Sequence, residues 1–515
     1  MTYGTREEGA GVTPRTPRRS RPVMLQRVRL DSAESATIAR RGLLSTLGVL
    51  FQGLARFVTN LLVGRIGGPT VLGAVATTLS TAQLLSLLWP TSTGNAASKF
   101  IAQARGRGDP AEASAVAAHL ARRTLQAGSA LSLLSVPIWT QIEHGSLRGA
   151  CVVVALVIGY SGYSFTRGLQ YGAGQVARAT WWDVTASAFG LLGVGVALLA
   201  GVRGTAVILP LAAAYILFTL ASWPWCAQGR PAATLRREVD SFVALGVVGT
   251  LASAGFLQLS LIVARLSDGL AAAGQYAAAL ALATPPSVLV ISFSQVLFPA
   301  MAESWGRGDV ERVRRQTDQA TRVLVVAMPL VFGALALCSP LIVRIIWGER
   351  YDRAATVLPV LLLAILANTI GTACTITLTS KSHRGMVTST AASLVGMATG
   401  VLFWAILAPR WGVLGVAIGY LCGTTVISAI PLIIVWRADR HRWGGLTIRL
   451  AVGITVLAAL LLGEHSLEPT IWLEPPIALA FVALWLGLMR NDARTALTLL
   501  NRQRRRGTPQ SQPTS

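Results

Sequence analysis

Runs of about 20 apolar residues fill most of this chain, and each is long enough, as a helix, to cross a hydrocarbon core of about 30 Å. Because hydrocarbon cannot satisfy bare backbone groups, these runs should be helical. A mean hydropathy of +0.56 and a charged share of 13% exclude an ordinary soluble domain. We therefore predict an all-α polytopic membrane protein with about fourteen transmembrane helices. The candidate spans are 43–64, 69–92, 124–141, 149–166, 182–201, 205–225, 242–264, 271–299, 323–343, 354–380, 385–408, 411–436, 446–463 and 471–489.

The net charge of +23 is distributed unevenly along the chain. If the N-terminus is cytoplasmic, most of the 45 Lys and Arg fall in the tails and cytoplasmic loops. The opposite side receives Arg65, Arg148, Arg203, Arg265, Arg344, Arg350, Arg353 and Arg410. This positive-inside bias predicts that both termini lie in the cytoplasm if the number of spans is even, and it explains the basic charge without a nucleic-acid partner. Arg outnumbers Lys by 43 to 2, which suggests a bacterial genome, so we expect a bacterial cytoplasmic-membrane protein. Aromatic residues near the predicted span ends fit an interfacial belt: Tyr160, Tyr163, Trp181, Trp182, Trp223 and Trp225.

A repeated tetrapeptide indicates that the chain contains a duplication. Gly-Arg-Gly-Asp at 106–109 recurs at 306–309, each time between apolar runs, and Arg122 matches Arg322 at the same offset. We interpret the tetrapeptide as a turn whose Asp caps the following helix. Each copy holds about six spans, an even number, so the copies should be parallel and related by an axis along the membrane normal.

The domain boundaries follow from this duplication and from the composition of the ends. We expect a disordered basic cytoplasmic tail over 1–41, an N-terminal six-helix lobe over 42–228, a cytoplasmic linker over 229–241, a C-terminal six-helix lobe over 242–438, an extra transmembrane helix pair over 445–489 and a basic cytoplasmic tail over 490–515.

Two segments of the first lobe carry a family resemblance. They read Leu-Val-Gly-Arg-Ile-Gly-Gly-Pro-Thr-Val-Leu-Gly at 62–73 and Ser-Lys-Phe-Ile-Ala-Gln-Ala at 98–104. Together with two parallel six-helix units, they resemble the polysaccharide flippase family, which includes O-antigen and exopolysaccharide repeat-unit flippases. Multidrug and toxin extrusion antiporters and lipid II flippases belong to the same superfamily. The resemblance covers roughly residues 40–440.

This resemblance implies a V-shaped bundle of two lobes that opens alternately to either side of the membrane. The implied cargo is an oligosaccharide linked to undecaprenyl diphosphate, surrounded by membrane lipids. A polysaccharide polymerase or glycosyltransferases are the implied protein partners, and no cofactor is implied. The extra C-terminal helix pair resembles that of lipid II flippases, where such a hairpin forms a groove for the lipid tail.

Arg56 is the ionisable residue placed deepest in a predicted span, and it shares one helix face with Gln52 and Asn60. A guanidinium in the membrane is costly unless it faces a wet cavity or a polar partner, and its planar fork suits phosphate oxygens. A binding site for the diphosphate of the lipid-linked sugar is one interpretation. An Arg satisfied by carbonyl groups between helices, or one that snorkels to the interface, are the alternatives.

Other polar residues inside spans are candidates for lining a hydrophilic cavity or for hydrogen bonds between helices. They are Thr77, Thr81, Gln83, Gln258, Gln275, Ser292 and Gln295. Pro285 and Pro286 should kink the span 271–299, either as a hinge or as an inert bend.

Two competing functions are considered beside the flippase. A cation-coupled antiporter normally needs a carboxylate in the membrane, and we expect the 22 carboxylates to lie in loops or tails, with Asp183 at the membrane edge the nearest to an exception. A polymerase or ligase would need a large outer loop with catalytic groups, and the predicted outer loops are short, so we expect no enzyme. The five cysteines lie far apart and show no metal or disulfide pattern.

The orientation can be tested by cysteine labelling from outside intact cells, with the five native cysteines replaced. Cysteines introduced at Arg107 and Arg307 should stay unlabelled, because both tetrapeptides are predicted to be cytoplasmic. A cysteine at Glu464 should be labelled. Strong external labelling at position 307 would reverse the predicted orientation.

Overall fold

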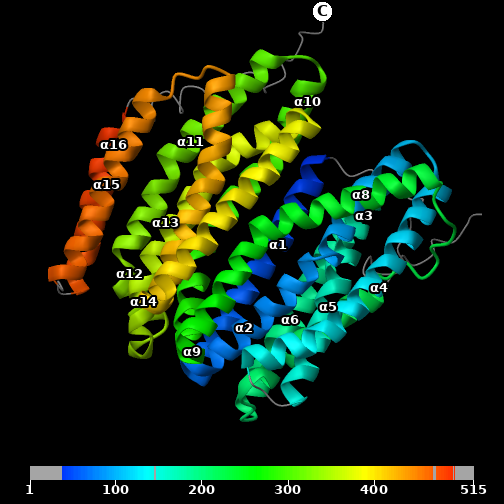
Figure 1. Ribbon diagram of the computed structural model, residues 1–515, viewed down its shortest axis with the longest axis horizontal. Coiled ribbons are helices and arrows are strands. Elements are labelled where there is room, and N and C mark those ends of the chain that lie inside the picture. The colour runs from blue at the N-terminus through cyan, green and yellow to red at the C-terminus, as the bar shows by residue number, and fades with distance from the viewer. Residues whose placement is uncertain (1–37, 144–146, 468–470, 491, 493–515) are drawn as a thin grey trace, which may run out of the picture.

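The computed structural model describes residues 38–143, 147–467, 471–490 and 492, and every regular element within them is a helix (Figure 1). The predicted all-α class is therefore confirmed. The two basic tails, predicted over 1–41 and 490–515, lie almost wholly outside the described residues.

The helices form two groups, one for each copy of the duplication, that lie side by side, except that the first helix of the second copy, α8, packs along α3 of the first group (Figure 1). The first contains α1 (Ile38–Leu62), η2 (Val63–Gly67), α2 (Gly68–Leu87), α3 (Pro90–Gly106), α4 (Pro110–Glu143), α5 (Leu147–Gly172), α6 (Val176–Leu199), η3 (Gly204–Ile208) and α7 (Leu209–Ser222). The second contains α8 (Ala233–Thr250), η4 (Leu251–Gly255), α9 (Phe256–Ala283), α10 (Ser287–Gly306), α11 (Val310–Leu337), α12 (Ser339–Ile346), η5 (Glu349–Tyr351), α13 (Asp352–Lys381) and α14 (His383–Ala438). The last helices, α15 (Gly444–Leu467) and α16 (Glu474–Leu488), flank η6 (Ile471–Leu473) and pack on α11 at the outer edge of the second group.

Glycines with positive φ separate several predicted spans that otherwise run on as one helix. Gly68 has φ 77°, Gly269 has φ 87° and Gly412 has φ 53°, values that favour glycine. Within the described ranges, nine helical stretches are long and apolar enough to cross a membrane, and some of them contain such a break. Neither α4, which holds the predicted span 124–141, nor the shorter α16 is among the nine, so the count of fourteen stays a prediction.

Both tetrapeptides adopt the predicted turn and helix cap. Gly108 and Gly308 have φ of 72° and 75°. The Asp109 carboxylate accepts a hydrogen bond from the backbone N–H of Glu112 at 2.8 Å, and the Asp309 carboxylate accepts the equivalent bond at 2.9 Å. These caps begin α4 and α11 in the same way, which confirms the interpretation of the repeated tetrapeptide.

The two groups meet where α2 crosses α9, and this crossing is reciprocal. A Cβ atom added to Gly73 would lie 2.0 Å from the Leu270 carbonyl oxygen, and one added to Gly274 would lie 1.9 Å from the Pro69 carbonyl oxygen. Gly68 and Gly269 mark equivalent breaks in the two copies and lie 201 residues apart, one more than the tetrapeptides. At this local offset, Gly274 and Leu270 take the places of Gly73 and Pro69. The same contact therefore occurs twice with the helices exchanged, which is the mark of a two-fold axis between parallel copies.

A second set of contacts joins the two groups at the end of the molecule where α1 meets α2. The Arg65 guanidinium donates to the carbonyl oxygens of Ile345 and Ile346 at the end of α12. The Tyr351 hydroxyl donates to the Gly64 carbonyl oxygen at 3.0 Å. By the predicted orientation this is the outer end of the molecule.

The predicted kink at Pro285 and Pro286 is present, because α9 ends at Ala283 and α10 begins at Ser287. Its use as a hinge stays a prediction.

The α2–α9 crossing predicts the effect of one added methyl group. Gly73→Ala and Gly274→Ala should each destabilise the protein by about 1–3 kcal/mol, because the methyl would overlap a backbone carbonyl. Gly195→Ala on α6 is the matched control, since a Cβ there meets nothing within 4 Å. Thermal unfolding of the detergent-purified variants measures the difference. Equal stability of Gly73→Ala and the control would contradict this close crossing.

Candidate functional site

Arg56 projects from α1 and meets a second predicted candidate on α2. Its Nη2 atom donates to Oε1 of Gln83 at 3.3 Å. The Arg56 side chain is exposed, whereas Gln52 and Asn60, one turn away on either side, are half-buried. No ion pair of Arg56 occurs among the described residues, so its positive charge is not compensated by a carboxylate there. The site thus combines one cation with neutral amide groups.

Gln52 begins a chain of polar contacts that joins α1 to α5 and α6. Its Nε2 atom donates to the Tyr163 hydroxyl at 2.7 Å, and that hydroxyl donates to Oδ1 of Asp183 at 2.8 Å. Nε of Arg167 donates to the other oxygen, Oδ2, at 3.0 Å. The Asp183 side chain is 1% exposed and that of Arg167 25% exposed. A fixed ion pair therefore orients the tyrosine, and the tyrosine orients Gln52.

Asp183 and Tyr163 were missed as site residues by the sequence interpretation. Asp183 was assigned to a membrane edge, but it is buried two turns into α6 and paired with Arg167, so the exclusion of carboxylates from the spans is wrong. Tyr163 was assigned to an interfacial belt, but its ring packs against Phe218, with centroids 4.8 Å apart, and the residue is 4% exposed. The available signal was an arginine and a carboxylate near facing ends of two consecutive spans, Arg167 just after 149–166 and Asp183 at the start of 182–201.

The threonine candidates of α2 do not line an open surface in this conformation. Thr77 and Thr81 are 0% and 1% exposed, and the Thr81 hydroxyl donates to the Thr77 carbonyl oxygen at 2.9 Å. Their hydroxyl groups face packed protein.

The candidates of the second group lie apart from these contacts. Gln258 is half-buried on α9. Gln295 and Ser292 are on α10, at positions whose side chains are not among those described. Gln275 has a structural role. Its Nε2 atom donates to the Arg350 carbonyl oxygen at 2.8 Å, and its Oε1 atom accepts from the Ala354 N–H at 3.1 Å.

The two copies differ at the position of Arg56. Its counterpart, Phe256, is fully buried and stacks on Trp404 with ring centroids 4.9 Å apart. The charged site therefore belongs to the first group alone.

Two family models each match more than half of the chain. The model described as lipid II flippase MurJ matches residues 182–474, and the model described as polysaccharide biosynthesis protein matches residues 38–305. No curated protein matches.

Solved structures with the same fold are transporters of low sequence identity. An inward-facing multidrug resistance MATE family transporter of the MOP superfamily is 15% identical over 76% of this chain and 94% of its own, with a TM-score of 0.64. The lipid II flippase MurJ in an inward closed conformation is 11% identical over 87% of this chain and 99% of its own, also with a TM-score of 0.64. A MOP superfamily transporter from Pyrococcus furiosus, whose binding pocket is described as having reverse polarity, is 16% identical over 81% and 98%, with a TM-score of 0.53.

The buried pair predicts a stability difference between two aspartates. Asp183→Ala should lower the unfolding temperature more than Asp268→Ala, whose partner Arg353 is exposed. Removing one partner of a buried ion pair leaves the other charge uncompensated and lowers the free energy of unfolding by up to about 3–5 kcal/mol. The partial exposure of Arg167 reduces this loss here. An exposed ion pair contributes only about 0–1 kcal/mol. Thermal unfolding in detergent measures both. Equal losses would show that the Asp183 pair is not structurally important.

Proposed function

Because this chain belongs to the family of polysaccharide and lipid II flippases, we propose that it carries a lipid-linked saccharide precursor across the bacterial cytoplasmic membrane by alternating access. The two family matches overlap and together extend from residue 38 to residue 474. The proposed cargo is an oligosaccharide on undecaprenyl diphosphate, and glycosyltransferases or a polymerase are the proposed partners in its pathway.

Arg56 is the observation that carries this proposal. An exposed guanidinium on α1, without a carboxylate partner among the described residues, is suited to a diphosphate, because its planar fork binds two oxygens at once. Gln83 restrains the fork through its 3.3 Å contact. Gln52 and Asn60, one turn to either side, would bond the sugar hydroxyls next to the diphosphate.

The pair of Asp183 and Arg167 acts in this proposal as a positioning element. It holds the Tyr163 hydroxyl, which fixes the Gln52 amide near Arg56. Because the pair is neutral as a whole, it would hold Gln52 in place without adding negative charge that would repel the phosphate.

Alternation requires one closed end to open. The contacts of Arg65 and Tyr351 close the predicted outer end, so they would break when the site faces outward. The reciprocal α2–α9 crossing would serve as the pivot between lobes over 42–228 and 242–438, and the interruption at Pro285 and Pro286 as a hinge within the second lobe.

A second function, cation-coupled export of a small molecule, is favoured by one observation. Asp183 is a buried carboxylate of the kind that such antiporters use. Arg167 already neutralises it, however, and the exposed charge of the site is the cation Arg56, which suits an anionic cargo. The flippase is therefore the better account.

Arg56→Ala should abolish surface polysaccharide in a complementation assay while the protein still reaches the membrane in normal amount. Arg56→Lys should retain part of the function, because the charge remains but the bidentate fork is lost. Gln52→Ala and Asn60→Ala should cause smaller losses, since neither side chain carries charge.

Arg203→Ala is the matched control, because Arg203 is an exposed arginine in the predicted outer connection between α6 and α7. It should leave polysaccharide export unchanged. Export at the wild-type level by well-expressed Arg56→Ala would refute the diphosphate site. A reduced amount of Arg56→Ala in the membrane would instead assign Arg56 a structural role.

A further inference from the structure

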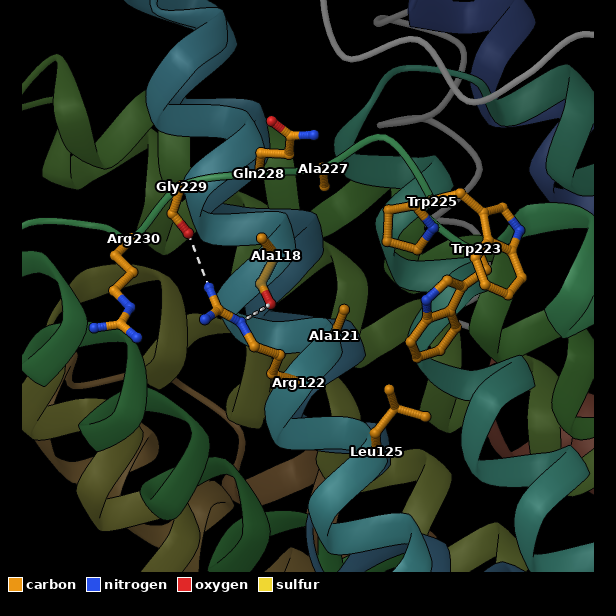
Figure 2. A pocket seen from close by; sticks show the side chains of 11 residues that line it. Ala118, Ala121, Arg122, Leu125, Trp223, Trp225, Ala227, Gln228, Gly229 and Arg230 are labelled. Atoms are coloured by element: carbon orange, nitrogen blue, oxygen red, sulfur yellow. Dashed lines mark hydrogen bonds between the residues drawn. The ribbon is translucent and has the colours of Figure 1, made fainter.

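A pocket of about 540 Å³ lies between α4 and the connection that follows α7 (Figure 2), and Arg56 is not part of its lining. Arg122, Arg230, Trp223, Trp225 and Leu125 are the side chains of interest in its wall. The described lining contains two guanidinium groups and no carboxylate. Its electrostatic character is therefore cationic.

The Arg122 guanidinium is held in a fixed orientation by the protein backbone. Its Nε atom donates to the Ala118 carbonyl oxygen at 3.1 Å, and its Nη2 atom donates to the Gly229 carbonyl oxygen at 2.8 Å (Figure 2). Arg230 follows Gly229 directly, so the backbone contact also holds the second arginine at the pocket. The two bonds leave the remaining N–H groups of Arg122 available to an anion.

The other side of the pocket is apolar and open. Leu125 is 56% exposed and Trp225 is 69% exposed, and the rings of Trp223 and Trp225 lie 6.5 Å apart. Exposed tryptophan at the end of a membrane helix is typical of the lipid headgroup region. The pocket therefore combines a cationic wall with a rim suited to acyl chains.

The duplication shows what the equivalent arginine binds in the second copy. Nη1 of Arg322 donates to Oδ1 of Asp492 at 2.7 Å, and Nη2 of Arg449 forms an ion pair with Oδ2 of the same carboxylate at 2.8 Å. Nη2 of Arg322 also contacts the Arg442 carbonyl oxygen, as Arg122 contacts that of Gly229. In the second copy an anion of the chain itself thus lies between two arginines.

The first copy has the equivalent arginine, Arg122, and a second arginine, Arg230, from the segment after α7, but no carboxylate lines this pocket among the described residues. Ala118 stands where the second copy has Asp318, whose Oδ2 atom lies 3.0 Å from Nε of Arg322. Asp492 follows α16, which ends at Leu488 and packs on α11 of the second group. Among the described residues, no carboxylate therefore completes the first copy as Asp492 completes the second.

We propose that the pocket between α4 and the 223–230 segment binds the phosphate of an anionic membrane glycerophospholipid, on the membrane face that carries both Gly-Arg-Gly-Asp turns. The phosphate takes the place of the Asp492 carboxylate, between Arg122 and Arg230. The acyl chains leave over Leu125 and Trp225. A soluble phosphate would use the same guanidinium groups but would gain nothing from this apolar rim.

Native mass spectrometry of the full-length, detergent-purified chain tests the proposal, with phosphatidylglycerol and phosphatidylcholine of the same acyl chains as probes. The wild-type protein should bind phosphatidylglycerol more tightly. Arg230→Ala should weaken that binding about fivefold, the contribution of one basic residue near an anionic surface. Arg230→Lys should restore most of it, because the charge returns, while Arg122→Ala should weaken binding and also free the 223–230 segment.

Arg236→Ala is the matched control, since Arg236 is an exposed arginine of α8 outside the pocket, and its binding should equal that of the wild type. Equal affinity for the two lipids would overturn the proposal, and so would an equal loss in the control. Inorganic phosphate that competes with phosphatidylglycerol at comparable concentration would also overturn it, because the site would then be one for a soluble anion. Arg230→Ala is the decisive variant, because it leaves the Arg122–Gly229 bond intact.

Discussion

The close crossing of α2 and α9 is the contact on which the two-group architecture depends. At Gly73 and Gly274 the backbone of each helix lies against a carbonyl group of the other, so a side chain at either position would force the groups apart. Packing of this kind suits a membrane, where lipid gives no hydrophobic reward for helix association and close backbone approach supplies the attraction instead. Because the contact is repeated by an approximate two-fold axis, one pair of glycines fixes both the spacing and the relative orientation of the copies.

The two copies share a similar backbone arrangement but differ in the polar and charged side chains that they carry. The first holds Arg56, its Gln83 contact and the chain from Gln52 to Asp183, while the second fills the Arg56 position with Phe256, stacked on Trp404. A lobe with a polar, partly exposed face can bind a charged headgroup. In the second copy the same position is closed by packed aromatic rings and carries no charge.

A similar division concerns the arginine that lies about three turns into the fourth α-helix of each copy, α4 or α11. Arg322 is used for assembly: its bond to Asp492 anchors the end of α16, and Nε1 of Trp485 adds a bond to the Val326 carbonyl oxygen at 2.9 Å. His441 stacks on Trp443 beside this anchor, with ring centroids 4.3 Å apart, and burial lowers the pKa of this connecting histidine. Arg122 has kept the same backbone contact but has no added helix pair to bind. The equivalent arginines thus differ in their contacts: Arg322 binds the Asp492 carboxylate of the same chain, and Arg122 lines a pocket.

The sequence by itself determined the elements whose causes are local. The length of the apolar runs predicted the helices. The repeated tetrapeptide predicted two turns and two Asp helix caps, because a turn and a cap depend only on residues within a few positions of each other. The i, i+4 spacing placed Gln52, Arg56 and Asn60 along one face of a single helix. Only the tertiary structure decided which partners those residues have. Asp183 looked like a residue of the membrane edge until the packing of α5 on α6 supplied Arg167 and Tyr163, since burial and pairing depend on neighbours distant in sequence. In the same way, Gln275 hydrogen-bonds the Arg350 carbonyl oxygen and Arg122 that of Gly229. Both partners are distant in sequence, so the spacing of residues along the chain could not predict these contacts.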